Sequence, residues 1–397
     1  MKKKLLFVMP SLSAGGGEKS LINLLSQLDY DQYEVDLFLL HQDGLFMAYI
    51  PKEVRLLPLP ADYREFAKPL AASLLGLLRR GKPGLAWSRL RFAANARKKR
   101  SIPENEQQGW KYTARALPPL TARYDAAIGF LENTATYFCV DKVEAVRKIG
   151  WMHIDYDQLG MDPAFDLPYF KRLDYLVTVS EECASVLRAR FPSEREKVKV
   201  MYNIVSPSII RKMAAMGEAD VYGRAQGETI ILSVGRLHYQ KGFETAVEAC
   251  RLLVSEGYNL RWCVIGEGEE RQALTEQIRA ANLEGRFELL GLRPNPYPYI
   301  QQADLYVQPS KFEGKSIAID EAKILAKPIV VTDFSTAKDQ IEHDRSGLIV
   351  GMDARAVADG IRRLLQEPRL RARLTEHLGQ AELGTEEEIA KLNRLLA

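Results

Sequence analysis

The chain has few cysteines, no long apolar run and little excess charge, and each shortage excludes a class of protein. Its four cysteines are scattered through apolar segments without metal-ligand spacing: Cys139, Cys183, Cys250 and Cys263. We therefore expect buried, reduced thiols in a cytoplasmic protein. The apolar stretches are too short to span a bilayer. A net charge of +3 is too small to indicate a nucleic-acid partner.

The amino terminus looks only briefly like a signal peptide. Three lysines follow Met1, but the apolar run after them ends at Pro10, which is too short for the apolar region of a signal. We interpret this run as a first buried strand, Leu5–Met9. A length of 397 residues, with 46% hydrophobic and 27% charged residues, predicts a soluble protein of two domains.

A strand, a glycine-containing loop and a helix follow one another twice in the chain. The first set is Leu5–Met9, Gly15–Gly17 and Glu18–Leu28, and the second is 229–234, 235–242 and 243–254. Further strands are predicted at 35–40, 126–130, 148–152, 175–179, 198–202, 262–265, 287–290, 305–307, 329–331 and 348–350. Each set is typical of the opening of a doubly wound α/β domain. We therefore predict two such domains facing a central cleft, with a boundary between residues 203 and 225.

The most informative stretch runs from Val307 to Asp333. A short strand ends at Pro309, Gly314 permits a tight turn, a helix is predicted over 316–326, and an apolar strand follows Pro328. This βαβ unit places a loop at the carboxyl end of a strand, where open α/β sheets bind ligands. Free amides after Gly314 and the positive end of the helix would suit a phosphate.

Two glutamates of this stretch lie eight positions apart. Glu313 is in the loop and Glu321 is about two turns into the helix, so each could bind a different part of one long ligand. Carboxylates so spaced suit a hydroxyl-rich molecule that carries phosphate. The alternative is an ordinary capped helix with a solvated Glu321.

The motif Pro309-Ser310-x-x-Glu313-Gly314, followed after six residues by Glu321 and then by Lys-Pro and an apolar strand, resembles the donor site of family 4 glycosyltransferases. These are retaining enzymes of the GT-B fold. The resemblance is strong over about 230–350, moderate over the first strand and loop, and weak over about 45–123. Lys315 and Ser316 stand where the family often has Phe-Gly or Leu-Pro, which leaves the sugar open.

The resemblance implies an α/β architecture of the GT-B type, with two doubly wound Rossmann-like domains. The acceptor-side domain would comprise residues 1–205, with a helix at about 385–397 packing back on it. The donor-binding domain would comprise residues 206–384.

Arg236 and Lys241 lie in one loop at the end of a predicted strand, between Gly235 and Gly242. Two cations there could flank a diphosphate, with the backbone close because of the glycines. The loop resembles the family segment whose Arg and Lys hold the donor diphosphate. The alternative is a plain basic loop.

The glycine run at 15–17 matches neither of two common phosphate-binding motifs. Glu18 stands where a P-loop needs Gly, and Ser20 stands where a dinucleotide fingerprint needs its third Gly. The resemblance makes it a glycine loop that faces the donor phosphate and the acceptor.

His153 follows a predicted strand and resembles the His-Asp or His-Glu element of the family, although Ile154 separates it from Asp155. In the family this His approaches the transferred sugar; the alternative is a structural, hydrogen-bonded His. Asp155 and Asp157 also form an Asp-x-Asp pattern typical of metal sites in another transferase fold. Two Rossmann-like halves and the lack of a second carboxylate cluster argue against a metal there.

The resemblance assigns a catalytic role to His153, Arg236, Lys241 and Glu313. It assigns donor binding to Gly16, Gly17, Gly235, Arg236, Lys241, Gly266, Arg293, Glu313, Gly314, Lys315, Ser316, Ile317 and Glu321. Loops such as those at Gly266 and Arg293 cup the nucleotide base in the family, largely through backbone atoms. No metal or other cofactor is expected.

The segment from Arg79 to Arg100 contains nine basic and no acidic residues, with Leu85, Trp87, Leu90 and Phe92 interleaved. An anionic membrane would attract such a segment. The alternative is a solvated helical hairpin that covers the core of the first domain.

Together these features predict a cytoplasmic, membrane-associated glycosyltransferase that moves a sugar with retention from a nucleoside diphosphate, UDP being favoured. The acceptor would be a hydroxyl of a saccharide or a lipid-linked molecule in bacterial surface polysaccharide synthesis, at the inner face of the cell membrane. Two alternatives stay open: a nucleotide-sugar epimerase of the same fold and a non-catalytic binding paralogue. The sequence leaves the sugar, the base and the acceptor undetermined.

Overall fold

The structure of this chain is a computed structural model that describes residues 2–13 and 15–396. Within these ranges the chain forms two compact units. Of the described residues, the first unit comprises 2–13, 17–202 and 388–396, and the second comprises 15–16 and 203–387. The main boundaries, 202/203 and 387/388, each lie three residues from those expected at 205/206 and 384/385. Met1 and Ala397, at the ends of the expected domains, lie outside the described residues.

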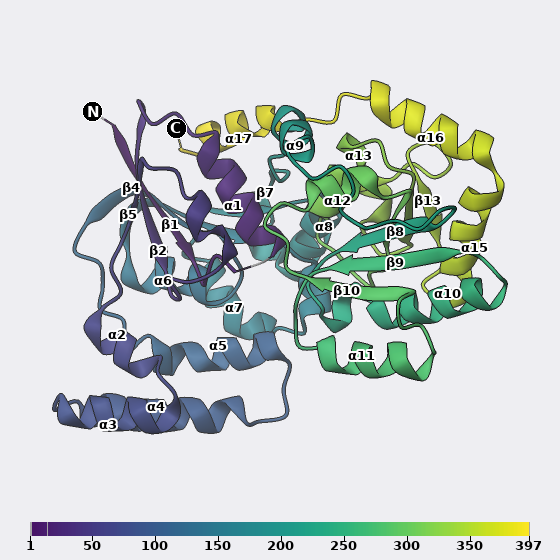
Figure 1. The fold of residues 1–397 in the computed structure, drawn as a ribbon. Helices are drawn as coiled ribbons and strands as arrows, with labels where there is room; N and C mark the ends of the chain where they lie inside the picture. The colour runs from purple at the N-terminus through teal and green to yellow at the C-terminus, as the bar shows by residue number, and fades with distance from the viewer. Residues whose placement is uncertain (1, 14, 397) are drawn as a thin grey trace. The chain divides into compact units, whose positions relative to one another are not determined.

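The first unit is built on a seven-stranded parallel sheet in the order β3-β2-β1-β4-β5-β6-β7 (Figure 1). Its strands are β1 (Lys3–Met9), β2 (Tyr33–Leu39), β3 (Val54–Leu56), β4 (Arg123–Gly129), β5 (Glu144–Met152), β6 (Tyr175–Thr178) and β7 (Val198–Val200). The strand order reverses between β1 and β4. Doubly wound sheets bind their ligands at the carboxyl ends of the strands at such a reversal.

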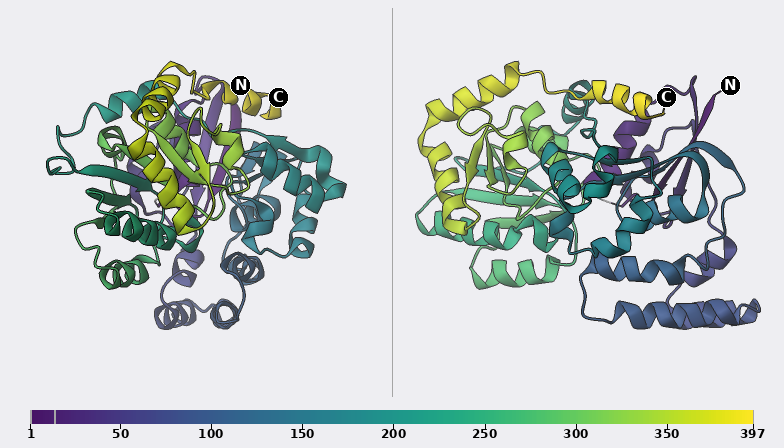
Figure 2. Two further views of the ribbon diagram at one scale, coloured as in Figure 1. Left: turned by 90° about the vertical axis from the view of Figure 1, so that its right-hand side faces the viewer. Right: turned by 180° about the vertical axis from the view of Figure 1, so that it is seen from behind.

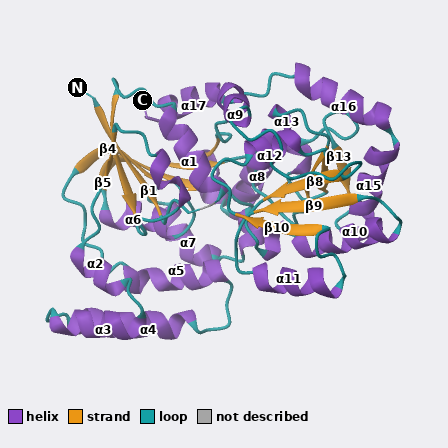
Figure 3. Ribbon diagram, in the orientation of Figure 1, coloured by secondary structure: helices purple, strands orange, loops and turns teal. Residues whose placement is uncertain are grey.

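Most strands of the first sheet read as apolar runs because the sheet is buried on both faces by helices (Figure 3). β3 was not predicted. It has only three residues, of which Val54 alone is buried, so it leaves no apolar run in the sequence.

The helices of the first unit are α1 (Gly16–Ser26), α2 (Ala61–Phe66), α3 (Leu70–Arg79), α4 (Pro83–Ala96), α5 (Ile102–Thr113), α6 (Thr134–Lys142), α7 (Pro163–Phe170), α8 (Glu181–Arg190) and α17 (Ile389–Leu396). The chain between β3 and β4 forms α2 to α5. In the left view of Figure 2, α3 and α4 lie side by side as an outer layer beneath α2 and α5. The helices of the described ranges include none whose length and hydropathy would let it cross a bilayer.

The last helix of the chain, α17, packs on the first unit. Lys3 Nζ donates to the carbonyl oxygen of Leu396 at 2.6 Å, and the Tyr33 hydroxyl donates to Asn393 Oδ1 at 3.0 Å. Just before α17, Glu388 Oε2 accepts the backbone N–H of Tyr202 at 2.9 Å. The carboxyl-terminal helix is thereby fixed beside β1 and β2.

The second unit has a six-stranded parallel sheet in the order β10-β9-β8-β11-β12-β13. Its strands are β8 (Thr229–Val234), β9 (Leu260–Ile265), β10 (Phe287–Gly291), β11 (Leu305–Gln308), β12 (Ile329–Thr332) and β13 (Leu348–Val350). Its helices are α9 (Pro207–Ala214), α10 (Phe243–Ser255), α11 (Arg271–Ala280), α12 (Tyr297–Gln302), α13 (Ile317–Ile324), α14 (Ala337–Gln340), α15 (Ala354–Gln366) and α16 (Pro368–Gln380). The strand order reverses between β8 and β11.

Helix α13 is shorter than the 316–326 predicted for it. The N–H of Lys327 bonds back to the carbonyl of Ala322 at 2.9 Å, and Ala326 has a φ of +52°. Such a reversal of the backbone ends a helix two residues earlier than the apolar pattern suggests.

Candidate functional site

Each sheet reverses its strand order once, and candidate residues gather at both reversals. In the second unit, the loops after β8 and β11 carry Lys241 and Glu313. In the first unit, the loop after β1 leads to Gly17, and the loop after β4 carries Glu132. His153 follows β5, the neighbour of β4.

Glycines allow three loops of the second unit to pack backbone against backbone. Gly242 has a φ of +63°, and a β-carbon there would lie 2.1 Å from the carbonyl oxygen of Pro309. A β-carbon on Gly266 would lie 1.9 Å from the carbonyl oxygen of Gly235. Only glycine avoids these clashes, because a backbone carbonyl cannot swing away as a side chain can. The loop after β8 is therefore held against the loops after β9 and β11.

Lys241 and Glu313 form an ion pair between the loops after β8 and β11. Lys241 Nζ lies 2.5 Å from Glu313 Oε1, and the two side chains are only 17% and 7% exposed. Reduced contact with water strengthens the attraction, but the loss of hydration opposes it. The hydrogen bonds that the carboxylate receives elsewhere therefore decide whether the pair is stable.

Two further donors meet Glu313 Oε1: Ser310 Oγ at 2.7 Å and Gln308 Nε2 at 3.2 Å. Gln308 is itself held by the Tyr306 hydroxyl at 2.6 Å. Glu313 Oε2 receives one long contact, 3.4 Å from Gln240 Nε2. Oε1 is thus committed to the protein, while Oε2 keeps acceptor capacity for a ligand. Sequence analysis did not predict that Gln308 binds Glu313. The signal available in the sequence was that polar residues, Gln308 and Ser310, stand at alternate positions after Tyr306.

Glu321 lies inside α13 and is 2% exposed, so the alternative of a solvated Glu321 is wrong. Its Oε1 accepts a hydrogen bond from the Tyr297 hydroxyl of α12 at 3.0 Å.

The sequence predicted free backbone amides after Gly314, at the start of α13. For Ser316 this prediction is wrong. Its N–H donates to Gln340 Oε1 at 2.8 Å, and Gln340 Nε2 donates back to its carbonyl at 2.8 Å. Lys315 lies 3.6 Å from Asp320. The amides of Ile317, Ala318 and Ile319 in the first turn of α13 have no acceptor within the helix, and they carry the positive end of the helix dipole.

Arg236 does not join Lys241 in this structure. Its side chain is 61% exposed and lies 3.3 Å from Glu269 in the loop after β9. His238 Nε2 lies 3.3 Å from the same carboxylate. Burial lowers the pKa of the His238 imidazole, which favours its neutral form. The two cations predicted to flank one diphosphate thus have different partners, a carboxylate of another loop and Glu313.

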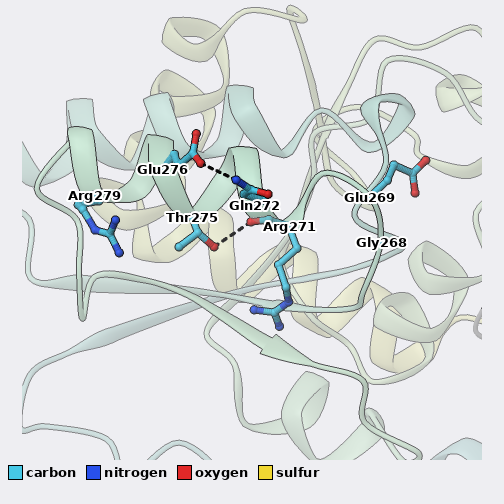
Figure 4. A pocket seen from close by; sticks show the side chains of 7 residues that line it. All are labelled: Gly268, Glu269, Arg271, Gln272, Thr275, Glu276 and Arg279. Atoms are coloured by element: carbon cyan, nitrogen blue, oxygen red, sulfur yellow. Dashed lines mark hydrogen bonds between the residues drawn. The ribbon is translucent and has the colours of Figure 1, made fainter.

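Figure 4 shows a hollow over α11 next to Glu269, and it contains none of the predicted donor residues. Its polar groups bond one another: Thr275 Oγ1 donates to the carbonyl of Arg271, and Gln272 Nε2 donates to Glu276 Oε1. Arg293, predicted to lie near the base, donates from Nε to the Tyr299 hydroxyl at 3.0 Å. We therefore assign no ligand to this hollow.

In the first unit Gly17, in the first turn of α1, packs on the loop after β4. A β-carbon on Gly17 would lie 2.9 Å from Leu131 Cδ1 and 3.9 Å from His153 Cγ. A β-carbon on Gly16 would have no described atom within 4 Å, so packing does not require glycine there. Of these two glycines, Gly17 is therefore the one whose surroundings exclude a side chain.

His153 is buried, with its ring centroid 5.0 Å from that of Phe130 and 6.2 Å from that of Trp151. Burial lowers its pKa to about 3, against a hydrogen bond to the Phe130 backbone, so the imidazole is neutral at pH 7. Nε2 has no hydrogen-bond partner among the described residues. A purely structural histidine would normally satisfy both ring nitrogens.

Glu132 is a candidate that sequence analysis missed. Its Oε1 accepts the backbone N–H of His153 and, at 3.1 Å, that of Ile154. Burial raises the pKa of Glu132 to about 7. The available signal was a carboxylate directly after the apolar run that ends at Leu131.

The two carboxylates of the Asp-x-Asp pattern have other partners. Asp155 Oδ1 accepts the backbone N–H of Asp157 at 2.9 Å, and Asp157 forms an ion pair with Arg190 at 2.8 Å. Throughout the described ranges, no three or more His, Cys, Asp or Glu side chains are grouped as metal ligands.

Comparison with known families supports the second unit most directly. Residues 218–378 match the family described as "Glycosyl transferases group 1". The chain is 34% identical over 145 residues to the amylovoran biosynthesis glycosyltransferase AmsK of Erwinia amylovora, covering 34% of this chain and 36% of that protein. It is 31% identical over 151 residues to the alpha-D-kanosaminyltransferase of Streptomyces kanamyceticus, covering 37% and 39%. These matches span well under two thirds of either relative.

Solved structures match the whole chain. HepE of Anabaena in complex with UDP-glucose matches with a TM-score of 0.67 and 18% identity over 99% of this chain and 98% of that one. TarM of S. aureus, in complex with fondaparinux, alpha-GlcNAc-glycerol and UDP, matches with a TM-score of 0.68 and 14% identity over 99% of each chain. The predicted GT-B fold and the resemblance to group 1 glycosyltransferases are confirmed, while membership of family 4 stays a prediction.

Replacing Gly242 by Ala should cost more stability than replacing Gly257 by Ala. Both glycines have a positive φ, +63° and +90°, so each change carries a backbone penalty of about 1–2 kcal/mol. Only at Gly242 would the new methyl group meet backbone, so we expect about 1–3 kcal/mol of further loss there. The measurement is the urea midpoint of unfolding. Equal losses would show that the loops separate without cost.

Proposed function

We propose that this chain is a glycosyltransferase that moves a sugar from a nucleoside diphosphate to a hydroxyl of a saccharide or lipid-linked acceptor. The observation that carries the proposal is the Lys241–Glu313 pair at the strand reversal of the second sheet, with Glu321 buried eight residues further on. A cation, a helix start and two carboxylates then meet one ligand that has phosphates and hydroxyls.

The donor would bind with its diphosphate toward Lys241 and the first turn of α13. Both supply positive charge where negative charge develops on the departing diphosphate, and the helix amides need no reorganisation. Glu313 Oε2 would accept hydroxyls of the sugar, since Oε1 already has three donors. Glu321 would accept the ribose hydroxyls beside its bond to Tyr297.

We propose that transfer retains the anomeric configuration. The acceptor oxygen would form a bond to the anomeric carbon on the face from which the diphosphate leaves. The bond between that carbon and the diphosphate oxygen breaks, and a phosphate oxygen takes the acceptor proton. The pairing of Glu313 with Lys241 supports this path, because an ion-paired, hydrogen-bonded carboxylate is a poor nucleophile.

UDP is the nucleotide favoured for the donor, because HepE and TarM are described in complex with UDP. A lipid-linked acceptor is supported by a relative from Campylobacter jejuni named for transfer onto a diphospho-undecaprenol saccharide, 27% identical over 204 residues. A role in surface polysaccharide synthesis is supported by AmsK and by the putative colanic acid glycosyltransferase WcaL of Escherichia coli.

A peripheral contact with an anionic membrane at the inner face of the cell membrane belongs to the same proposal. Leu75 and Leu78 of α3 and Trp87 and Leu90 of α4 are 51%, 55%, 58% and 40% exposed. Their spacings of three place them on the outward side of each helix, in the layer seen in Figure 2. Leu85 and Phe92, interleaved in the same segment, instead pack on the core of the unit.

The basic residues of the segment fall into two groups. Arg80 and Lys82 pair with Asp62, Arg100 pairs with Glu104, and Arg89 bonds backbone carbonyls. The others form no ion pair with a described residue and keep their charge for an outside partner: Arg79, Arg91, Arg97, Lys98 and Lys99. Apolar side chains among free cations suit a negatively charged bilayer surface.

The proposed reaction is tested with a panel of uridine, guanosine and adenosine diphosphate sugars and saccharide or lipid-linked acceptors. We expect transfer that persists in excess EDTA and a product whose anomeric configuration, read by NMR, is that of the donor. Loss of transfer that manganese restores would overturn metal independence, and an inverted product would overturn retention. Conversion of the donor without acceptor would indicate the epimerase instead. Binding of donors without any turnover would indicate a non-catalytic paralogue.

Lys241→Ala should lower the transfer rate by on the order of 10²–10³, because one donor to the developing charge is lost. Lys311→Ala is the matched control. Lys311 lies in the adjacent loop but pairs with Glu244 at 2.6 Å, so its loss should leave the rate near normal. Circular dichroism checks that both variants fold. Arg236→Ala is compared in the same assay, and a normal rate would remove Arg236 from the diphosphate site.

Replacing Arg97, Lys98 and Lys99 by Gln should weaken binding to liposomes that contain anionic lipid. Each basic residue near the surface contributes about 1 kcal/mol, so the partition coefficient should fall by on the order of 100-fold at low salt. A variant with Arg355, Arg369 and Arg371 changed to Gln removes the same charge from the second unit and should bind normally. Wild-type protein that ignores anionic liposomes at low salt in a cosedimentation assay would contradict the membrane contact.

A further inference from the structure

Glu132 is a buried carboxyl that the proposed reaction does not use. It lies three residues after the end of β4, at the strand reversal of the first sheet, and is 8% exposed. Its Oε1 accepts two successive backbone N–H groups, those of His153 and Ile154. This one oxygen therefore ties the end of β4 to the peptide that carries the His153 ring.

Among the described residues, no cation forms an ion pair with Glu132. Glu106 of α5 repels its charge, and the neutral His153 and Cys183 of α8 also lie near it. Burial raises the pKa of Glu132 to about 7, while the two backbone N–H groups lower it. The carboxyl accordingly changes charge near neutral pH.

Because the pKa of Glu132 is raised in the folded state, its ionisation lowers the stability of the fold. The folded state binds the proton more tightly than an exposed glutamate, whose pKa is 4.5, so stability falls as pH rises from 4.5 through 7. A glutamine of the same shape would avoid that loss. A buried charge that costs stability at neutral pH is typical of functional sites.

The position of the His153 ring depends on the peptide that Glu132 holds. The ring packs against Phe130, which itself contacts Trp151, and these rings limit its tilt, while a bond to the Phe130 backbone occupies one side. Its Nε2 is the polar atom left without a partner among the described residues. A small shift of the peptide would turn this nitrogen away from a ligand.

We infer that ionised Glu132 is a positioning residue that fixes the 153–154 peptide and so presents His153 Nε2 to the sugar or acceptor in the active site. The inference rests on the proposed function, because it assigns His153 to the substrate. Deprotonation strengthens both hydrogen bonds at the carboxylate, since charged acceptors bind N–H groups more strongly than neutral ones. The transfer rate should therefore rise with pH through about 7.

The test is Glu132→Gln, which keeps an acceptor oxygen in place but removes the charge. We expect kcat to fall about tenfold, the donor KM to change little, and the rise of kcat through pH 7 to disappear. Glu144→Gln is the control, because Glu144 is exposed and, among the described residues, forms its ion pair with Arg123. A Glu132→Gln enzyme with the wild-type kcat and pH profile would overturn the inference.

Two further measurements test the positioning role of Glu132 and do not require an activity assay. In wild-type protein, the amide resonances of His153 and Ile154 should titrate near pH 7, and in Glu132→Gln they should not. The variant should also unfold at a higher temperature than wild type at pH 8, with the difference shrinking toward pH 5. Amide resonances that stay constant with pH in wild type would overturn the positioning role. Absence of transfer with every donor, alongside titrating amides, would instead overturn the proposed function and leave the contact intact.

Discussion

The ion pair between Lys241 and Glu313 requires two loops to meet that are neighbours only because the strand order of the second sheet reverses. A pair this shielded is stable only if its remaining hydrogen-bonding capacity is met, and Ser310 and Gln308 meet it from the β11 side. On the β8 side, Gly242 lets the chain pass against the carbonyl of Pro309. The contact between these two loops therefore explains both why Gly242 follows Lys241 in one loop and why Ser310 precedes Glu313 by three residues in the other.

The loops at the two strand reversals could be predicted because each is marked by the residues on either side of it in the sequence. Buried parallel strands read as apolar runs, and the polar or glycine residue after each run marks its carboxyl end. Loops at 235–242 and 309–316 and His153 were located in this way. The three-residue strand β3 was not, since Val54 is its only buried residue.

The partners of the site residues could not be predicted, because they come from distant parts of the chain. Gln340 caps Ser316 from 24 residues away, Tyr297 binds Glu321 across 24 residues, and Glu269 reaches Arg236 across 33. No spacing rule relates such residues, whereas tertiary packing does. The same limit explains why Glu132 was missed: its effect lies in backbone bonds to His153 and Ile154, which leave no trace in residue type.

The two reversal points have opposite electrostatic character. The second unit offers Lys241 and a helix start, which suit an anion, while the first offers a neutral imidazole and a carboxyl that forms no ion pair with a described residue. A diphosphate would be repelled by ionised Glu132, whereas a neutral hydroxyl would gain a hydrogen bond from His153. The charge at each reversal point is therefore consistent with the proposal that the second unit binds the diphosphate of the donor.

The α3–α4 layer combines two attractions that respond differently to salt. Charge on residues such as Arg97 and Lys98 acts over about a Debye length and is screened at physiological ionic strength, whereas burial of Trp87 or Leu78 in the bilayer interface is not. Neither contribution is large, since only a few side chains of each kind face outward. In the proposed membrane contact these contributions would sum to a reversible adsorption: the cations would draw the unit to an anionic surface, and the apolar side chains would prolong the contact once it forms.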